Sequence, residues 1–307
     1  MKKVRNWAQY NESLVNRSRI TFWFREDVLK LWNHDNRDYR RGRPFIYSDT
    51  AIETLLLVRE VFHLTYRGAE GVGRDAFLLL GVQDSRIPDY SSICKRSKTL
   101  NVSLKVRNKR GPFNVIVDST GLKVYGEGEW KVKKHGISKR RTWRKLHVMI
   151  DAKTQQVVAA ETTSNSVDDA SVVPDLLSHC DGRVKTLRGD GAYDKRKVYK
   201  ATSERGIQPI IPPRKDARLD HVGAWGTNGC YRNDAIVTTR LSGSDAYAWK
   251  EKVQYHQRSL VETTMFRIKK LFGDRLKNRI MENQKVETMV KVKALNMFAL
   301  LAAMHFL

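Results

Sequence analysis

The chain has 307 residues, of which 41% are hydrophobic, enough for a packed core and for two domains or one large one. Lys and Arg total 57 against 33 acidic residues, so the formal net charge is +24. This excess is larger than solubility requires and indicates a polyanionic partner. The basic N-terminus has no apolar run behind it, and the most apolar segment, ALNMFALLAAMHFL, is too short to span a bilayer. We therefore expect a buried terminal helix and a cytoplasmic protein, with Cys94, Cys180 and Cys230 as reduced, buried thiols.

Residues 1–110 carry helical patterns without good strand runs. The helical segments are ITFWFREDVLKLW and a long stretch from Ser48 to Val82, with Ser48 or Asp49 as the helix start and Glu53 nearby. A short basic segment follows, IPDYSSICKRSKTL, in which Lys95 and Arg96 can face DNA. This order resembles a helix-turn-helix domain with a final recognition helix. A helical bundle with a basic surface is the alternative.

A compact basic element lies near residues 39–44, before these helices. Its sequence Arg41-Gly42-Arg43-Pro44 has no bulky side chains. Such an arm can enter the narrow minor groove of A·T-rich DNA, so Arg41 and Arg43 are candidate DNA contacts. An ordinary basic linker explains the same four residues equally well.

From residue 111 onwards, short β-rich runs alternate with turns. Three of these runs follow one another, FNVIVDSTGLKVYG, KLHVMIDAKT and QQVVAAETTSN, and the later runs VKTLRGDGAY and IQPIIPP alternate with helical segments. This order predicts an α/β fold in which an antiparallel meander is joined to a parallel βαβ part. Residues 214–250 are rich in turn residues and are predicted to form a loop-rich insertion.

A strongly basic run extends from Lys131 to Lys145 and contains eight Lys or Arg residues and no acid. Basic side chains neutralise phosphates, and aromatic rings can stack on unpaired bases, so DNA contact is favoured over a solvated hairpin with a buried Trp143. His147, shortly after this run, is expected to pack within a strand. The candidate DNA contacts here are Trp130, Lys131, Lys133, Lys134, Arg140, Arg141, Arg144 and Lys145.

Asp118 is predicted to lie on or at the end of a central strand, and Asp190 at the C-terminal end of a later strand. Asp118 follows NVIV and Asp190 follows VKTLRG, so both can converge in one cleft with Glu262 from a later helix. Three carboxylates without a His or Cys cluster favour Mg²⁺ or Mn²⁺ over zinc, and two such ions suit phosphoryl transfer. The alternatives are a turn at Asp190-Gly191 and a turn cap at Asp118. The competing acids are Asp151, Asp168, Asp169 and Asp194.

The segment YHQRSLVETTMFRIKK, residues 255–270, is predicted to form an amphipathic helix. At 100° per residue its polar residues Tyr255, Arg258, Glu262 and Lys269 share one narrow stripe. An apolar stripe lies directly beside it, so the polar residues are expected at the rim of a core. Surface ion pairs are the alternative explanation of the polar stripe. The apolar stripe consists of Val261, Met265, Ile268 and Phe272.

The spacing Tyr255-x₂-Arg258-x₃-Glu262-x₆-Lys269 resembles the signature around the catalytic glutamate of bacterial insertion-sequence DDE transposases. The blocks IVDSTGLKVYGEGEWKVKKHG, WRKLHVMID, DGAYD and IPPRK are similar to blocks of one large subgroup of that family. The resemblance implies a ribonuclease-H-like catalytic domain over residues 111–307, a mixed sheet flanked by helices. It also implies that Asp118, Asp190 and Glu262 bind two divalent metal ions, with Tyr255, Arg258 and Lys269 close to DNA.

The function implied by the resemblance is transposition. The expected protein binds the terminal inverted repeats of an insertion sequence as a homodimer or higher homo-oligomer, in the cytoplasm at the nucleoid. It cleaves the strand with water and then joins it by attack of the freed 3′-hydroxyl on target DNA, with Mg²⁺ or Mn²⁺ as cofactor. Two alternatives are a nuclease that cuts without joining and a transposase-derived DNA-binding protein without catalysis.

Overall fold

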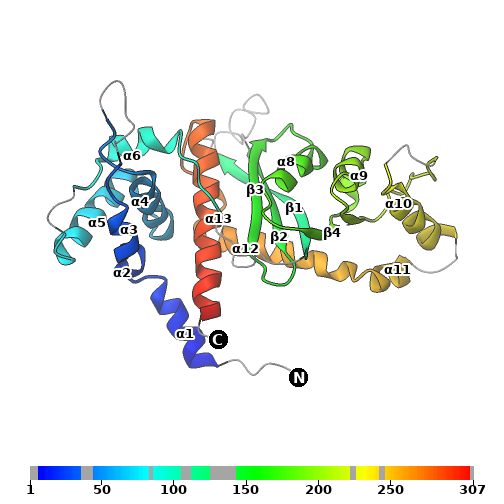
Figure 1. Cartoon of the computed structure of the whole chain (residues 1–307), viewed down its shortest axis with the longest axis horizontal. Helices are drawn as coiled ribbons and strands as arrows, with labels where there is room; N and C mark the ends of the chain where they lie inside the picture. Colours follow the sequence, from blue (N-terminus) through cyan, green and yellow to red (C-terminus); the bar gives the residue numbers. More distant parts are fainter. Residues whose placement is uncertain are drawn as a thin grey trace, which may run out of the picture. The chain divides into compact units, whose positions relative to one another are not determined.

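The computed structural model describes residues 6–35, 44–82, 86–104, 112–124, 143–221, 226–241 and 246–304. The chain divides into two compact units (Figure 1). Unit 1 comprises Met1–Lys105 and Leu271–Leu307, and unit 2 comprises Val106–Lys270. The start of unit 2 is close to the predicted boundary near residue 110. The C-terminal segment, however, groups with the N-terminal helices and not with the predicted catalytic domain.

Unit 1 is helical and is built around α4 (Asp49–Val61) and α13 (Met281–Met304), which pack against each other. Both helices bury apolar side chains, including Leu55 and Val58 on α4 and Leu295 and Phe298 on α13. Burial of this apolar surface explains why the C-terminal segment belongs to unit 1. The remaining elements are α1 (Trp7–Asn16), α2 (Ile20–Trp23), α3 (Glu26–Lys30), α5 (Tyr66–Leu79), α6 (Tyr90–Ser97) and the short strand β6 (Arg275–Leu276).

Side-chain caps fix where four of these helices begin, and Asn6 caps α1 by accepting from the N–H of Gln9. The hydroxyl of Ser48 accepts a hydrogen bond from the backbone N–H of Ala51, which confirms the predicted start of α4. Thr65 caps α5 and Asp89 caps α6 in the same way. Glu53 takes no part in the cap of α4, because it forms an ion pair with Lys293 of α13.

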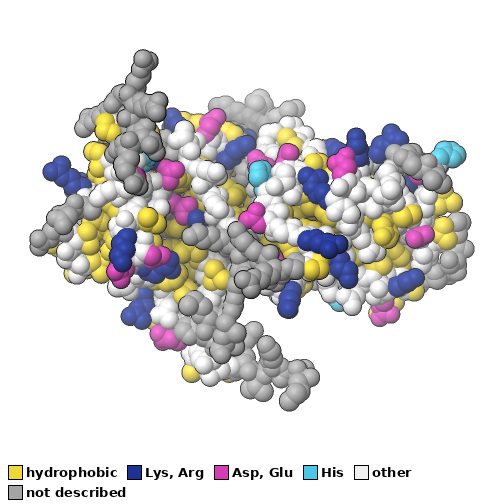
Figure 2. All heavy atoms as spheres, viewed as in Figure 1, with side chains coloured by type: hydrophobic (Ala, Val, Ile, Leu, Met, Phe, Trp, Pro, Cys, Tyr) yellow, Lys and Arg dark blue, Asp and Glu magenta, His cyan; other side chains and the backbone are white. Residues whose placement is uncertain are grey.

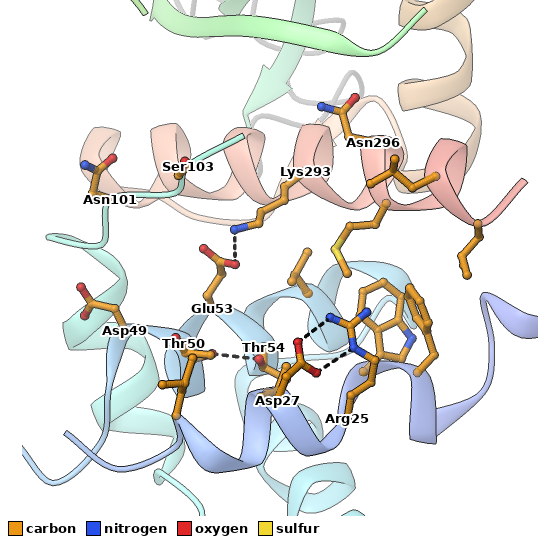
Figure 3. Close-up of a pocket in the computed structure, with 18 residues that line it drawn as sticks. Arg25, Asp27, Asp49, Thr50, Glu53, Thr54, Asn101, Ser103, Lys293 and Asn296 are labelled. Carbon is orange, nitrogen blue, oxygen red and sulfur yellow. Dashed lines mark hydrogen bonds and ion pairs between the residues drawn. The ribbon is translucent and has the colours of Figure 1, made fainter. Parts of the chain in front are cut away.

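Unit 1 contains a cavity of about 440 Å³ between α2, α3, α4 and α13 (Figure 3). Apolar side chains such as Trp23 and Met297 line part of it. The ion pair between Glu53 and Lys293 forms another part of the wall, together with the pair of Arg25 and Asp27. In the described part of the chain, no helix is both long and apolar enough to cross a membrane.

Unit 2 contains a mixed sheet in the order β3-β2-β1-β4-β5. The strands β1 (Phe113–Val124), β2 (Trp143–Asp151) and β3 (Val157–Ser164) form the predicted antiparallel meander. The strands β4 (Val184–Arg188) and β5 (Gln208–Ile210) add to β1 in parallel, as also predicted. The sheet is therefore mixed and β1 lies at its centre.

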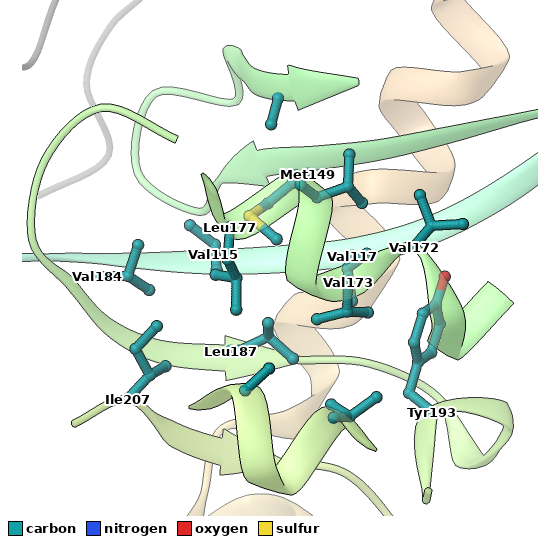
Figure 4. Packing of buried hydrophobic residues seen from close by; sticks show 14 of the residues in the cluster. Val115, Val117, Met149, Val172, Val173, Leu177, Val184, Leu187, Tyr193 and Ile207 are labelled. Atoms are coloured by element: carbon teal, nitrogen blue, oxygen red, sulfur yellow. The ribbon is translucent and has the colours of Figure 1, made fainter. Parts of the chain in front are cut away.

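Helical segments join the later strands and cover one face of the sheet. These are η1 (Asp169–Ser171), α8 (Val173–Ser178), η2 (Gly191–Tyr193) and α9 (Arg196–Ser203). The buried cluster on this face includes Val115 and Val117 of β1, Leu187 of β4 and Leu177 of α8 (Figure 4). Alternate residues of β1 point to opposite faces, so Asp118 points away from the face that Val117 packs against.

The predicted loop-rich insertion at 214–250 contains more helix than expected. It includes α10 (Gly229–Ile236), the π-helical turn η3 (Val237–Leu241) and α11 (Ala246–Lys252). Ala235 and Trp249 from these helices pack against Ile210 of β5. The Gly and Asn residues of this segment are typical of loops. The small apolar cluster nevertheless stabilises helices that the local sequence does not favour.

The prediction of three buried cysteines is wrong. Cys94 and Cys180 are partly buried and Cys230 is exposed. All three are free thiols. Burial raises the pKa of the Cys180 thiol to about 11, with smaller contributions from the nearby acids, so this thiol is held in its protonated form.

Candidate active site

The register between β1 and β4 places Asp118 and Asp190 beside each other. The two strands are parallel, and Ile116 lies opposite Arg188. Asp118 and Asp190 each follow that pair by two residues, and the backbone at Asp190 remains extended with φ −81° and ψ −178°. Both carboxylates therefore lie at the same level of neighbouring strands, where the sequence predicted strand ends. Asp118 lies within β1, which continues to Val124 after its pairing with β4 ends, and this confirms the prediction that it lies on or at the end of a central strand.

Arg258 links Asp118 to Glu262. One guanidinium nitrogen of Arg258 donates a hydrogen bond to Oδ2 of Asp118 at 3.2 Å. The other nitrogen donates to Oε1 of Glu262, one helical turn further along the chain. Glu262 lies in the first turn of α12 (Ser259–Phe272) and its side chain is 53% exposed. A single cation thus bridges two carboxylates that are 144 positions apart in the sequence.

The sequence predicts one amphipathic helix over residues 255–270. In the structure, however, the segment from Tyr255 to Phe272 is not one continuous α-helix. Residues Tyr255–Arg258 form the 3₁₀ turn η4, preceded by Gln254 in a left-handed conformation with φ 53°. A 3₁₀ turn has three residues per turn, so Tyr255 does not lie on the predicted 100° stripe. The apolar stripe is confirmed, because Val261, Met265, Ile268 and Phe272 are buried. The turn half-buries Tyr255, whose ring centre lies 5.9 Å from that of Trp249.

The site has an excess of negative charge. Burial raises the pKa of Asp118 above 3.8, although the Ser119 N–H and Arg258 lower it, and the charges of Asp190 and Glu262 raise it further. Tyr255 has its pKa raised to about 12, mainly by burial. Burial alone lowers the pKa of Arg258, but the surrounding negative groups outweigh burial and raise it. A cation placed here therefore gains electrostatic stabilisation.

The competing acids have other partners. Asp194 is buried and receives a hydrogen bond from Arg232 at 2.8 Å. Asp151 caps its own turn through the backbone of Lys153 and Thr154, as predicted for a hairpin residue. Asp168 pairs with Lys195 and Lys197, and Asp169 pairs with Lys145. Asp118 and Asp190 also make one local hydrogen bond each, to the N–H groups of Ser119 and Ala192.

The donor chemistry of Asp118, Asp190 and Glu262 fits a hard divalent cation. All three are carboxylates, and burial raises the pKa of Asp118, with smaller contributions in the same direction from the charges of Asp190 and Glu262. Within the described residues, however, no three acidic, His or Cys side chains are gathered closely enough to hold a metal ion. In this arrangement Arg258 forms an ion pair with one carboxylate oxygen of Asp118 and with one of Glu262, so two of the three acids each have one oxygen occupied.

The predicted DNA contacts divide into three groups. Lys95 is exposed on α6 and Lys269 is partly exposed on α12. Arg96 is engaged within unit 1, where it donates to Tyr47 and Asp49 and stacks on the Phe45 ring, and Lys145 is engaged with Asp169. Arg144 lies on β2 and donates to the Trp143 carbonyl. Outside the described residues lie Arg41, Arg43, Trp130, Lys131, Lys133, Lys134, Arg140 and Arg141.

Arg188 supports the site but was not predicted from the sequence. It is buried at the end of β4 and donates to the Thr186 hydroxyl at 2.8 Å and to the Val253 carbonyl at 3.3 Å. The hydrogen bond to the Val253 carbonyl connects β4, which leads to Asp190, with the segment that leads to Tyr255. The sequence feature that could have indicated Arg188 is its position two residues before the candidate aspartate Asp190. His147, by contrast, is buried in β2 and hydrogen-bonded to Thr163, as expected for a packed residue.

Comparison with known proteins identifies the family. A model described as a transposase DDE domain matches residues 112–297, which is more than half of the chain. The chain belongs to the transposase DDE-domain family. A second transposase DDE-domain model matches residues 15–127. Membership of this transposase family confirms the broader part of the resemblance, and the insertion-sequence subgroup stays a prediction.

Individual relatives of this transposase-family chain are distant. An uncharacterised protein of Aquifex aeolicus (strain VF5) is 23% identical over 256 residues, which is 77% of this chain and 72% of that protein. The piggyBac transposase synaptic complex with hairpin DNA aligns with 95% of this chain and 75% of its own, at 11% identity and a TM-score of 0.38. The Drosophila P element transposase strand transfer complex aligns with 95% and 86%, at 10% identity and a TM-score of 0.28.

Proposed function

We propose that the chain binds the terminal inverted repeats of an insertion sequence, cleaves the DNA strand at each end and joins the freed 3′-hydroxyl to target DNA. Membership of the transposase DDE-domain family supports the reaction class. The observation that carries the proposal is the register that aligns Asp118 with Asp190, together with the Arg258 bridge to Glu262. The surface ion-pair alternative does not account for the contact of Arg258 with Asp118, which lies on a different element from Glu262.

Asp118, Asp190 and Glu262 would hold two Mg²⁺ or Mn²⁺ ions. Bound there, such ions activate the attacking oxygen and stabilise the leaving oxygen of an in-line phosphoryl transfer. The same site can serve hydrolysis and strand transfer because both are displacements at phosphorus. No protein nucleophile is required, so Ser119, Thr120 and Tyr255 form no covalent intermediate in this proposal.

Three residues of the η4–α12 segment are assigned to the DNA. Arg258 can exchange a carboxylate for a phosphate oxygen, since a guanidinium binds both with the same two-nitrogen geometry. Lys269 lies seven residues after Glu262 on α12, two turns further along the helix. Tyr255 keeps its hydroxyl protonated, because burial raises its pKa to about 12, and it can donate a hydrogen bond to the DNA backbone.

The DNA partner is supported by charge. The formal net charge is +24, and Lys and Arg side chains are spread over the face shown in Figure 2. We assign recognition of the terminal repeats to the helices of unit 1, with Lys95 on α6 as an exposed candidate contact. The reaction joins two DNA ends, which requires at least two active sites held together, so the working form would be a homodimer or a higher homo-oligomer.

A test of the three acids uses isosteric amides. Asp118→Asn, Asp190→Asn and Glu262→Gln should each lower Mg²⁺-dependent strand cleavage by roughly 10³-fold, because each removes a charge that stabilises the transition state. The substrate is a linear DNA that carries the sequences flanking the coding region. Asp175→Asn, an exposed residue of α8, is the matched control and should cleave normally. Full activity in any one of the three variants would remove that residue from the proposed site.

Strand transfer separates transposition from simple hydrolysis. Supplied with precleaved ends and a target plasmid, the wild-type chain should produce joined products under Mg²⁺. Cleavage without joining would establish the nuclease alternative. Tight, sequence-specific binding with no cleavage in Mg²⁺ or Mn²⁺ would establish the DNA-binding alternative.

A further inference from the structure

The most exposed aromatic ring among the described residues belongs to Phe266 on α12. The residue is 65% exposed, and in that part of the chain no other ring and no cation packs on its face. Single exposed apolar residues are common on protein surfaces, so exposure alone assigns no role. The surroundings of this ring on the helix distinguish it from the others.

The phase of α12 places Phe266 away from the hydrophobic core. At 100° per residue, the ring lies about 100° or more from each residue of the buried apolar stripe. The nearest of these is Met265, which is 7% exposed. The neighbours of the ring on the exposed side of the helix are polar, namely Ser259, Glu262 and Thr263. The ring is therefore an isolated aromatic group on a polar surface, and an apolar protein partner would need a larger patch.

Phe266 lies one turn beyond the candidate metal ligand Glu262. Four residues along an α-helix correspond to about 6 Å of rise and about 40° of rotation, so the two side chains are neighbours on one side of α12. Arg258 fixes which side this is, because its guanidinium pairs with Glu262 and also with Asp118 of β1. The ring therefore projects from the side of α12 that faces the proposed site.

The charges next to the ring suit a nucleic acid strand. Lys269 follows Phe266 by three residues and is partly exposed, and α12 carries no acid after Glu262. Surfaces that bind an unpaired strand combine cations for the phosphates with aromatic rings on which the bases stack. A phenyl ring has no hydrogen-bonding group, so it can bind a base only through its face and does not select one base over another.

The spacing on the helix limits which base the ring can reach. Successive nucleotides of one strand are about 3.4 Å apart along the duplex axis, so the rise of about 6 Å from Glu262 covers roughly two nucleotides. The face of a base is open to a side chain where the base has lost a stacked neighbour. This occurs at an unpaired or kinked step, and it also occurs at the terminal base pair that cleavage creates.

We propose that Phe266 binds the DNA by stacking on a nucleobase within about two nucleotides of the phosphate that is cleaved. The inference rests on the proposed function, because it requires the Glu262 side of α12 to face the DNA. Stacking at this position holds the reacting strand in register with the metal ligands. The base is either unpaired before the cut or part of the terminal base pair after it, and the test distinguishes the two.

Substitution of Phe266 tests the ring directly. Phe266→Ala should weaken binding of a DNA end by roughly 5- to 100-fold, measured by fluorescence anisotropy with Ca²⁺ in place of Mg²⁺. Phe266→Tyr retains the ring and should bind like wild type, whereas Phe266→Leu should bind as weakly as Phe266→Ala. The melting temperature should be the same in all of these proteins, since the side chain is exposed. Wild-type affinity in Phe266→Leu or Phe266→Ala would overturn the proposal.

A base-removal scan identifies the stacked base. Each nucleotide near the cut is replaced singly by an abasic one, in an intact duplex and in a precleaved end. At the stacked position wild type should lose about as much affinity as Phe266→Ala does, and Phe266→Ala should lose little more. Such a position in the intact duplex means that the base is unstacked before the cut, and one found only in the precleaved end means that it belongs to the terminal pair. If every removal weakens both proteins equally, the ring contacts no base and the proposal fails.

Tyr247→Ala is the matched control. Tyr247 is 62% exposed in the same unit, but it lies on α11 and its hydroxyl donates to Glu251 at 3.3 Å. This variant should bind both DNA substrates as wild type does. A loss equal to that of Phe266→Ala would show that the effect is not specific to α12, and the assignment would be wrong.

Wild type in the same assays checks the proposed function separately. If wild type binds neither substrate more tightly than a random duplex and cleaves neither in Mg²⁺, the proposed function fails. If wild type binds and cleaves while Phe266→Ala behaves identically, only the role of Phe266 fails.

Discussion

The guanidinium of Arg258 faces Asp118 and Glu262. Its positive charge partly compensates carboxylates that would otherwise repel each other. A divalent cation needs the same oxygens, so the arginine and the ion compete for them. Arg258 therefore has two roles in the proposed site. It stabilises the site before the ion binds, and it is available to a phosphate afterwards.

This competition makes a prediction about Arg258→Gln. Without the guanidinium, Asp118 and Glu262 are free to bind an ion, so Mn²⁺ affinity without DNA should rise by roughly 3- to 10-fold, equivalent to about 1 kcal/mol of released ion pairing. Strand cleavage should fall by about 10²-fold, because the phosphate loses its cation. Calorimetry and a cleavage assay measure the two effects. Lys270→Gln, an exposed cation on α12, should change neither, and weaker Mn²⁺ binding in Arg258→Gln would contradict the competition.

Among the elements, α13 carries an unusual buried charge network. Glu287 is fully buried and accepts from Lys291 at 2.8 Å and from the side chain of Asn278 at 2.8 Å. Arg59 and Glu60 of α4 are also buried, and Lys291 Nζ lies 3.8 Å from Glu60 Oε2. These contacts join α13 to α4 by charge as well as by apolar packing. Removal of one member leaves the others buried and uncompensated.

The network predicts a pH-dependent stability that Glu287→Gln should reduce. Burial alone raises the pKa of Glu287, but Lys291 and the other donors outweigh burial and hold it below its ordinary value of 4.5. The carboxylate is therefore fully stabilising above about pH 4.5, and its contribution is lost as the pH falls through the folded value. Glu60 acts in the opposite sense, because burial raises its pKa and its contribution falls as the pH rises.

Urea unfolding of wild type and Glu287→Gln between pH 3 and pH 8 measures this contribution. At pH 7 the variant should lose roughly 3–5 kcal/mol of stability. The difference between the two proteins should shrink as the pH drops below about 4.5. Glu282→Gln, exposed in the first turn of the same helix, should follow the wild-type profile. A difference that stayed constant across the pH range would rule out the charge of Glu287 as the cause.

An element could be predicted from the sequence where neighbouring residues determine it, and could not where contacts with distant residues determine it. The strands of unit 2 were predictable because their apolar runs and turn residues are local signals, and so was the cap at Ser48. The break between η4 and α12 was not, because Gln254 adopts its left-handed conformation beside a packed Tyr255 and Trp249. The burial of Tyr193 was not predictable either, because nothing within DGAYD shows that its side chain is buried.

At the scale of the whole molecule, the formal charge of +24 predicts salt-dependent DNA binding. Each neutralised phosphate releases counterions, so the logarithm of the binding constant falls linearly with that of the salt concentration, by about 0.9 per contact. Replacing Lys133, Lys134, Arg140 and Arg141 by Gln should reduce this slope by about 0.9 for each residue that touches a phosphate.

Fluorescence anisotropy with duplex DNA at several salt concentrations measures the slope. Lys30→Gln is a suitable control, since Lys30 is paired with Glu26 at 2.6 Å, and its slope should match wild type. An unchanged slope in the fourfold variant would place the DNA elsewhere on the molecule.

The parallel pairing of β1 with β4 also has a consequence for how this sequence can vary. Ile116 and Arg188 are fixed opposite each other by the backbone, so the 71 residues between them can lengthen or shorten in their loops without moving Asp118 or Asp190. A single residue inserted at position 117 or 189 would instead turn one carboxylate to the opposite face of the sheet. Natural insertions should therefore be tolerated in the segment after β1. They should be excluded at positions 117 and 189, directly before Asp118 and Asp190.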